Sequence, residues 1–505
     1  MQTLSDLLQI GHAVANAISA PGRRPLTYSG LRRHVEKTVA GLNQIGIGRN
    51  DRVAIVLPNG PEMATAFISV AAGATAAPLN PTYQQTEYDF YLEDLGTKAL
   101  LVTAGSDSSA VAAAEALSIP VLEIHVGVED AAGVFDIQPR TLPAEKSSVV
   151  GFAEPDDVAL ILHTSGTTSR PKIVPLLQRN LCASARNIKQ TLALDPIDHC
   201  LNVMPLFHIH GLMAALLASL SAGASLCCTP GFNALQFFAW LDAEKPSWYT
   251  AVPTMHQAIL ARARRNQEII ASANLRFVRS SSASLPPQVM AELEDTFNAP
   301  VIEAYGMTEA SHQMTSNPLP PAPRKPGSVG IAIGLEVGIM DDAGHLLPHG
   351  NIGEIVIRGA NVTPGYENNP AANAENFTNG WFRTGDQGEQ DDMGYVMIRG
   401  RLKEIINRGG EKISPREVDE VLMDHPAVQQ VVTFALPHPK LGEDVAAAVV
   451  LKAGAIATER DIREYAATYL ANFKVPRKVL IMDEIPKGPT GKLKRIGMAE
   501  QLGLA

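Results

Sequence analysis

Apolar residues along the first 300 positions alternate between helical spacing and short continuous runs. From residue 31 to residue 45 they recur every three or four positions, which predicts a helix that Ser29 can cap. Residues 53–57 and 99–102 are short apolar runs, typical of buried strands. This alternation of helices and strands predicts an α/β fold with a largely parallel sheet.

The pattern changes in the last third of the chain, where apolar runs become shorter and turns more frequent. The runs at 354–359 and 395–400 lie on either side of a Pro-Gly-Tyr turn. Short strands separated by turns predict a β-barrel-like subdomain at about 325–400.

Helix and strand signals begin again after residue 400, starting with a helix that Ser414 caps and Pro415 opens. We therefore predict a large N-terminal domain, residues 1–400, built from two mixed α/β sheets and the β-rich subdomain. Residues 401–505 are predicted to form a small α+β domain.

Composition excludes several classes of protein. The 505 residues carry a formal net charge of −10, which argues against nucleic acid as the main partner. We find no signal peptide at the N-terminus, and the longest apolar stretch is too short to span a bilayer. The four cysteines lack metal-ligand spacing, which is typical of reduced thiols. These features predict a cytoplasmic protein with no membrane partner.

A loop of small hydroxyl residues follows the predicted strand at 158–162. Its backbone N–H groups, hydroxyls and cations suit a polyphosphate, although the loop does not have the Walker A spacing. The candidate phosphate ligands are Thr164, Ser165, Gly166, Thr167, Thr168 and Lys172.

Three further motifs carry candidate chemistry. The segment 303-EAYGMTEASH-312 places a flat aromatic ring, a hydroxyl and a carboxylate close together, and Gly306 would let the backbone approach a ligand closely. Alone, it is typical of a helix start with a solvated Glu309. The turn 381-WFRTGD-386 offers a carboxylate for vicinal hydroxyls, and 486-PKGPTGKLKR-495 gathers cations near the C-terminus.

Taken together, these motifs resemble those of the adenylate-forming superfamily, which includes the acyl-CoA synthetases. The strings that carry the resemblance are HTSGTTSRPK, EAYGMTEASH, WFRTGD, NRGGEKISP and PK-x-x-x-GK-x-x-R. Two departures are Ser169 and Ile173, which stand where the superfamily usually has glycine. The resemblance implies an acid–thiol ligase that uses ATP, Mg²⁺ and CoA.

The resemblance also implies roles for individual residues. Tyr305 would stack on adenine, Thr308 would contact the α-phosphate, and Glu309 would hold Mg²⁺. Lys492 would be the catalytic cation of adenylation. The remaining nucleotide contacts implied are Ser282, Glu303, Ala304, Gly306, and the ribose ligands Asp386 and Arg401.

In this superfamily the C-terminal domain swings between the two half-reactions. The resemblance implies a hinge near Lys403 and a mobile C-terminal lid. Swinging would exchange Lys492 for the loop at Gly409 and Gly410, which opens a tunnel for CoA. Phe473 would lie on the CoA side of this tunnel.

The segments that surround the acid in this superfamily are polar here. The motif 204-MPLFHIHG-211 contributes His208, taken as catalytic, and His210. Further polar candidates for the acid site are Arg279, Ser280 and His312, with Ser282 as another hydroxyl donor. So many polar groups would be costly around a fatty-acyl chain and suit a small acid with a second carboxylate.

Over most of its length the chain resembles oxalate–CoA ligases of plants and fungi. Malonate-type ligases generally have an arginine at the position of Ala304, so oxalate is favoured. A ligase for another small or aromatic acid, such as malonate or a hydroxycinnamate, stays open. So does a stand-alone adenylation enzyme that serves a carrier protein. The enzyme is expected to be a monomer or a homodimer.

Overall fold

The computed structural model describes residues 1–144, 146–147, 149–164, 171–486, 493 and 495–504. The chain divides into two compact units. The first unit comprises Met1–Leu285, Val289–Glu336 and Ile357–Phe377, and the second comprises Pro286–Gln288, Val337–Val356 and Thr378–Ala505. The predicted boundary at residues 400–401 and the hinge at Lys403 stay predictions.

One sheet of the first unit confirms the predicted parallel α/β pattern. Its strands lie in the order β7-β6-β5-β3-β4-β8-β9, with parallel pairing from β6 through β8 and antiparallel pairing at both ends. The strands are β3 (Arg52–Val56), β4 (Thr75–Pro78), β5 (Ala99–Thr103), β6 (Val121–His125), β7 (Asp136–Pro139), β8 (Val158–Thr164) and β9 (Lys172–Leu177).

The helices that accompany this sheet are α2 (Tyr28–Gln44), α3 (Pro61–Ala71), α4 (Gln85–Asp94) and α5 (Ser109–Ala116). The predicted helix at 31–45 is α2, but Ser29 does not cap it. Thr27 is the N-cap, because its hydroxyl accepts a hydrogen bond from the Gly30 amide at 3.2 Å.

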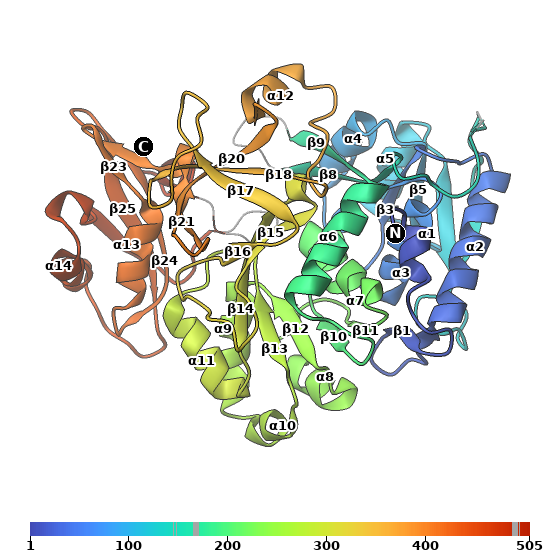
Figure 1. The fold of residues 1–505 in the computed structure, drawn as a ribbon, viewed down its shortest axis with the longest axis horizontal. Coiled ribbons are helices and arrows are strands. Elements are labelled where there is room, and N and C mark those ends of the chain that lie inside the picture. Colours follow the sequence, from blue (N-terminus) through green and yellow to red (C-terminus); the bar gives the residue numbers. More distant parts are fainter. Residues whose placement is uncertain (145, 148, 165–170, 487–492, 494, 505) are drawn as a thin grey trace. The chain divides into compact units, whose positions relative to one another are not determined.

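Another sheet of the first unit has the strand order β16-β15-β14-β13-β12-β10-β11-β1-β2. Figure 1 shows α8, α9, α10 and α11 gathered around its central strands. The strands are β1 (Asn16–Ser19), β2 (Leu26–Thr27), β10 (His199–Asn202), β11 (Ser225–Cys228), β12 (Trp248–Ala251), β13 (Phe277–Ser280), β14 (Val301–Met307), β15 (His312–Ser316) and β16 (Ile331–Ala332).

The helices near this second sheet are α1 (Leu4–Leu8), α6 (Gln178–Thr191), η1 (His210–Leu217), α7 (Ala218–Ser221), α8 (Phe237–Glu244), α9 (Pro253–Ala263), α10 (Gln267–Ser272) and α11 (Pro287–Phe297). The parallel strands β10 to β14 bury a core with Phe237, Tyr249 and Phe297 at its centre. Since β14 pairs with β15 in antiparallel fashion, this sheet is mixed, as predicted.

The predicted β-rich segment forms a further sheet, ordered β17-β18-β20-β19, with β21 paired to β20. Its elements are β17 (Leu335–Met340), β18 (Gly353–Gly359), α12 (Pro370–Asn376), β19 (Phe377–Thr378), β20 (Trp381–Gln390) and β21 (Val396–Arg401). The prediction of short strands in this segment is therefore confirmed.

The C-terminal part of the second unit is an α+β structure. Its sheet has the order β23-β22-β25-β24, with β26 beside β25, and α13 lies against β24 (Figure 1). Ser414 caps α13 as predicted, accepting from the Glu417 amide. The elements are β22 (Ile406–Arg408), β23 (Glu411–Ile413), α13 (Pro415–Met423), β24 (Val428–His438), β25 (Gly442–Leu451), α14 (Glu459–Tyr469), β26 (Lys478–Ile481) and α15 (Met498–Gln501).

Within the described ranges, none of the helices combines the length and the apolar character needed to cross a bilayer. The cysteines are buried and form no disulfide, as their sequence context indicates; they are Cys182, Cys200, Cys227 and Cys228.

Candidate active site

The strand that leads into the hydroxyl-rich loop pairs with the strand that leaves it. β8 ends at Thr164 and β9 begins at Lys172, and these two residues are partners in the antiparallel register. Ile173, which replaces a glycine of the superfamily, is buried in the core and continues the strand. The other predicted phosphate ligands lie outside the described residues: Ser165, Gly166, Thr167 and Thr168.

The segment from Glu303 to His312 is a hairpin and not the start of a longer helix. Tyr305 and Gly306 lie on β14, and Thr308 and Glu309 lie on the single 3₁₀ turn η2 (Thr308–Ala310) that leads into β15. Strands on both sides, paired with each other, compete successfully with local helix propensity. The turn therefore fixes the hydroxyl and the carboxylate between two strands.

Gly306 is required by packing against the protein itself. A Cβ atom at this position would lie 1.8 Å from the backbone oxygen of His312. The structure thus shows a close approach between the two strands of the hairpin, and the predicted approach of a ligand to Gly306 stays a prediction. His312 has a φ of 96°, a strained value for a residue with a side chain.

Glu309 and Lys172 meet through an aromatic side chain that lies between them. The phenol of Tyr366 donates a 2.8 Å hydrogen bond to Oε1 of Glu309, which is only 5% exposed. The Lys172 ammonium lies 4.4 Å from the centroid of the same ring, a cation–π contact. Two motifs distant in sequence are therefore linked in the first unit.

The described residues contain no cluster of three or more His, Cys, Asp or Glu side chains able to hold a metal. Mg²⁺ commonly takes one or two carboxylates and completes its shell with phosphate oxygens and water. Glu309, a carboxylate that is only 5% exposed and is linked through Tyr366 to Lys172, fits that kind of site.

Glu303 and Ala304 hold the neighbouring loop in place. Oε1 of Glu303 accepts a hydrogen bond from the Leu285 amide at 3.1 Å. The carbonyl of Ala304 accepts one from the Ser281 hydroxyl at 2.8 Å. These contacts fix the backbone on both sides of Ser282, whose φ is 73°.

A buried cation lies among the residues predicted to surround the acid. Arg279 on β13 is fully buried, and burial lowers the pKa of its guanidinium to about 9. Nη2 donates to Oε1 of Gln313 at 3.2 Å, and Nη1 lies 3.4 Å from Nε2 of His210. Within the part of the chain that the structure describes, no carboxylate pairs with this guanidinium.

His210 is the centre of this polar cluster. It begins the π-helix η1 and is fully buried. Nδ1 lies 3.0 Å from Oγ of Ser282, and Nε2 lies 2.7 Å from Oγ1 of Thr250. The ring of His312 packs edge-on against it, with the ring centroids 5.0 Å apart.

The structure thus brings together most of the residues predicted for the acid site. His210, Arg279, Ser282 and His312 are linked by hydrogen bonds or ring contact. The buried hydroxyl of Ser280 has no hydrogen-bond partner among the described residues. Nδ1 of His208 accepts a hydrogen bond from the His210 amide at 3.3 Å, which leaves its ring beside the cluster.

The two predicted ribose ligands are neighbours in the second unit. Asp386 on β20 and Arg401 on β21 are register partners, and Nε of Arg401 lies 2.9 Å from Oδ1 of Asp386. Asp386 is only 4% exposed. The pair therefore presents a fixed carboxylate beside a cation.

Lys492 lies outside the described residues, but the residue that anchors its motif does not. The guanidinium of Arg495 forms ion pairs with Asp419 at 2.6 Å and with Glu404 at 3.3 Å. Nη1 also donates to the Thr433 carbonyl at 2.8 Å. These contacts fix the C-terminal end of the predicted catalytic segment to the second unit.

The predicted CoA elements occupy the same unit. Gly409 and Gly410 form the turn between β22 and β23, with φ values of 62° and 104° that favour glycine. Phe473 lies on the 3₁₀ turn η4 (Asn472–Lys474) and packs partly against the core. Lys403 lies on the 3₁₀ turn η3 (Leu402–Glu404).

Comparison with known proteins gives the family. Residues 11–367 match the AMP-binding enzyme family, and residues 417–492 match the AMP-binding enzyme C-terminal domain. The chain belongs to the AMP-binding enzyme family. The superfamily predicted from the sequence motifs is therefore confirmed.

Individual relatives of this AMP-binding enzyme support the same family assignment. The chain is 46% identical over 489 residues to the oxalate–CoA ligase of Arabidopsis thaliana, covering 95% of this chain and 94% of that protein. It is 43% identical over 475 residues to the oxalate–CoA ligase of Saccharomyces cerevisiae, with coverages of 90% and 87%. The crystal structure of ATP-bound MatB from Rhodopseudomonas palustris matches with a TM-score of 0.88 and 28% identity, covering 99% of this chain and 98% of that one.

Three residues that contact the predicted site residues of this AMP-binding enzyme were not themselves predicted from its sequence. Tyr366 was noted only as part of a turn, and Thr250 and Gln313 were not singled out. Their contacts join residues far apart in the chain, so local spacing gives no signal for them. A polar side chain on an otherwise apolar strand, such as Thr250 on β12, is the only available hint.

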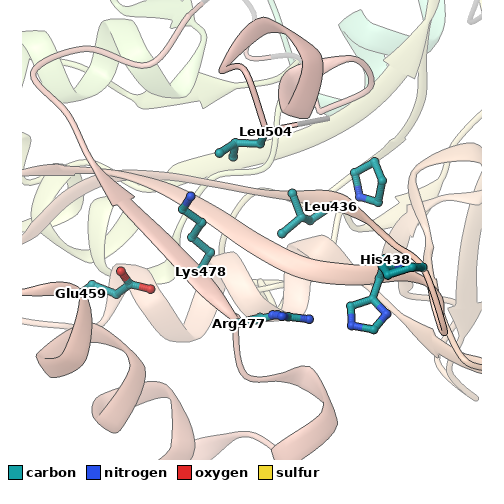
Figure 2. Close-up of a pocket in the computed structure, with 8 residues that line it drawn as sticks. Leu436, His438, Glu459, Arg477, Lys478 and Leu504 are labelled. Carbon is teal, nitrogen blue, oxygen red and sulfur yellow. The ribbon is translucent and has the colours of Figure 1, made fainter.

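A hollow of about 450 Å³ in the second unit is separate from these residues (Figure 2). Charges of both signs lie around this hollow. Arg477 lies 3.7 Å from Asp444, and the carboxylate of Glu459 accepts a hydrogen bond from the Val479 amide. None of the predicted site residues lines it. The lining residues are Leu436, Pro437, His438, Pro439, Glu459, Arg477, Lys478 and Leu504.

Proposed function

We propose that the protein is an ATP-dependent oxalate–CoA ligase. A carboxylate oxygen of oxalate attacks the α-phosphorus of ATP, and the bond to pyrophosphate breaks, which gives oxalyl-AMP. The sulfur of CoA then attacks the acyl carbon, and AMP leaves. The products are oxalyl-CoA, AMP and pyrophosphate.

The observation that carries the proposal is the fully buried guanidinium of Arg279. A buried charge is costly unless an opposite charge or several hydrogen bonds offset it. Its nearest partners, Gln313, His210 and Thr250, are all uncharged or weakly basic groups. Because no carboxylate among the described residues offsets this positive charge, the neighbouring site favours an acid with a second carboxylate over an acid with an apolar tail.

Relatives support the same acid. The two oxalate–CoA ligases share 43% and 46% identity with this chain. Ala304 stands where malonate-type ligases generally have an arginine, and its side chain is buried on β14. The absence of that arginine supports oxalate over malonate.

For adenylation, we assign the second carboxylate of oxalate to His312 and the hydroxyls of Ser280 or Ser282, with His210 holding Ser282 beside it. Tyr305 would stack on adenine, and Thr308 would contact the α-phosphate. Asp386 and Arg401 would hold the ribose, and Lys492 would offset the charge that grows on the α-phosphate. Glu309 would hold Mg²⁺, which when bound neutralises phosphate charge.

For thioester formation, we propose that the C-terminal residues turn about Lys403. The turn at Gly409 and Gly410 would then border the pantetheine tunnel, since glycines leave room for a narrow chain. Phe473 would lie beside the nucleotide of CoA. We further propose a cytoplasmic enzyme that works as a monomer or a homodimer.

The test is pyrophosphate release across a panel of acids, with and without CoA. Oxalate should give the highest kcat/KM, and malonate, acetate and 4-coumarate should be poorer substrates. Acid-dependent pyrophosphate release without any CoA-dependent thioester would instead indicate an adenylation enzyme that serves another acceptor. Preference for acetate or 4-coumarate would refute oxalate.

A further inference from the structure

We infer that Thr250, Arg279 and Gln313 form a buried relay that fixes the tautomer of His210 and so turns the Ser282 hydroxyl into a donor for the acid. None of these three residues was predicted to act on His210. The role of Ser282 as a donor to the acid rests on the proposed function, whereas the tautomer of His210 does not.

The relay is defined by short polar contacts in the interior of the first unit. Nε2 of His210 lies 2.7 Å from Oγ1 of Thr250 and 3.4 Å from Nη1 of Arg279. The same Nη1 lies 3.5 Å from Oγ1 of Thr250. All three residues are fully buried, so water does not compete for these contacts.

Arg279 determines which nitrogen of His210 carries the proton. A guanidinium has only N–H donors and no acceptor. A proton on Nε2 would therefore point an N–H group toward the donors and positive charge of Arg279. The favourable arrangement has a lone pair on Nε2, which accepts from the Thr250 hydroxyl, while that hydroxyl oxygen accepts from Nη1.

The proton of His210 then lies on Nδ1. Nδ1 is 3.0 Å from Oγ of Ser282 and donates to it. Because the serine oxygen accepts this bond, its own hydrogen must point away from His210. Ser282 therefore presents an O–H donor, which suits a carboxylate oxygen of the acid.

Gln313 holds the guanidinium of Arg279 in place. Its Nε2 donates to Oγ1 of Thr191 at 2.9 Å, and the Thr191 hydroxyl donates to the Asn187 carbonyl at 2.7 Å. Thr191 can therefore only accept from the amide, which fixes the amide oxygen toward Nη2 of Arg279. A neutral oxygen orients the guanidinium without cancelling its charge.

The loop that carries Ser282 is fixed independently of the relay. Ser281 donates to the Ala304 carbonyl, and Leu285 donates to Glu303. Removing the Thr250 hydroxyl should therefore change the proton position on His210 without releasing the loop. This makes Thr250 a positioning residue.

The tautomer is measured directly by ¹⁵N NMR of histidine-labelled protein without any acid. The His210 signal is assigned by its loss in His210→Gln. Wild type should show a neutral ring with the proton on Nδ1 at neutral pH. A proton on Nε2, or a charged ring, would overturn the relay, even if oxalate is the substrate.

Thr250→Val and Gln313→Glu then test whether the relay determines the proton position on His210 and the recognition of oxalate. Valine removes the donor to Nε2, and glutamate gives Arg279 a charged partner, so each should shift the ¹⁵N signals of His210. Each should also lower kcat/KM for oxalate about tenfold and leave KM for ATP within about twofold. Thr65→Val is the matched control, because it removes another buried threonine hydroxyl, bonded to Gly133, from the same unit.

The outcomes separate the two proposals. If the ¹⁵N pattern is as expected but oxalate is not a substrate, the relay stands and the proposed function fails. If either variant leaves both the His210 signals and oxalate kinetics like wild type, the relay is refuted. If Thr250→Val does not fold, the wild-type spectrum and the Gln313→Glu variant still test the relay.

Discussion

The phenol oxygen of Tyr366 lies 2.8 Å from Oε1 of Glu309 and donates a hydrogen bond to it. Glu309 sits on a turn between two strands, and Tyr366 comes from a segment 57 residues away. The same ring receives the ammonium group of Lys172 on its face. The orientation of the proposed Mg²⁺ ligand therefore depends on a residue outside every motif that carried the sequence-based prediction.

Tyr366→Phe should slow adenylation. It removes a hydrogen bond to a carboxylate, which is worth about 1.5–3 kcal/mol, so acid-dependent pyrophosphate release should fall about ten- to a hundredfold. The Lys172 contact with the ring is kept. Steady-state kinetics at saturating and limiting Mg²⁺ measure the effect.

Tyr469→Phe, which removes a phenol hydroxyl from a residue that is 65% exposed, serves as the control and should behave like wild type. Unchanged adenylation in Tyr366→Phe would show that Glu309 does not need this bond.

Lys492→Ala should separate the two half-reactions. A cation aimed at growing phosphate charge is worth roughly 3 kcal/mol or more, so pyrophosphate release should fall by at least about a hundredfold. Conversion of preformed oxalyl-AMP and CoA to thioester should persist. Equal losses in both assays would contradict the role assigned to Lys492.

His210→Ala and His312→Ala should weaken recognition of the acid. His312→Ala removes a polar contact to the carboxylate, and His210→Ala removes the group that orients the Ser282 donor toward it. Each contact is worth about 1.5–3 kcal/mol, so kcat/KM for oxalate should fall about ten- to a hundredfold. KM for ATP should change little, because neither residue is assigned to the nucleotide. Parallel losses for oxalate and ATP would argue that these histidines only support the fold.

The buried histidine His256 should make stability depend on pH. Burial lowers the pKa of His256 to about 4, and its ring lies against the Tyr249 hydroxyl. In the unfolded chain the pKa is about 6.5, so the unfolded state binds the proton first as pH falls. Stability should decline between about pH 6.5 and pH 4, by roughly 3 kcal/mol in total from this residue.

His256→Phe should flatten this part of the curve, as measured by denaturant unfolding at several pH values. His345→Phe is the control, because the side chain of His345 is 77% exposed. If both variants keep the wild-type slope, His256 does not cause the decline.

The sequence predicted the fold class correctly, because helices and strands leave local patterns of apolar residues. Period-three and period-four spacing marked α2, and apolar runs marked β3 and β5. The motif strings indicated the family, and four of the predicted residues, including Arg279 and His210, lie in one connected cluster.

What the sequence did not indicate depends on contacts made only in the folded chain. Local propensity around Glu309 favours a helix start, but pairing of β14 with β15 reduces it to a single turn. Gly306 faces the His312 backbone across that hairpin. Gln313 meets Thr191 across 122 positions of sequence, so its orientation cannot be deduced from spacing.

The most direct measurement of the proposed activity is mass-spectrometric detection of the thioester formed from oxalate, ATP and CoA, together with AMP. Oxalyl-CoA and AMP should form in equal amounts, and both should fall strongly in Arg279→Met at unchanged KM for ATP. Absence of oxalyl-CoA, or formation of acetyl-CoA or 4-coumaroyl-CoA in preference to it when the acids compete, would contradict the proposed function.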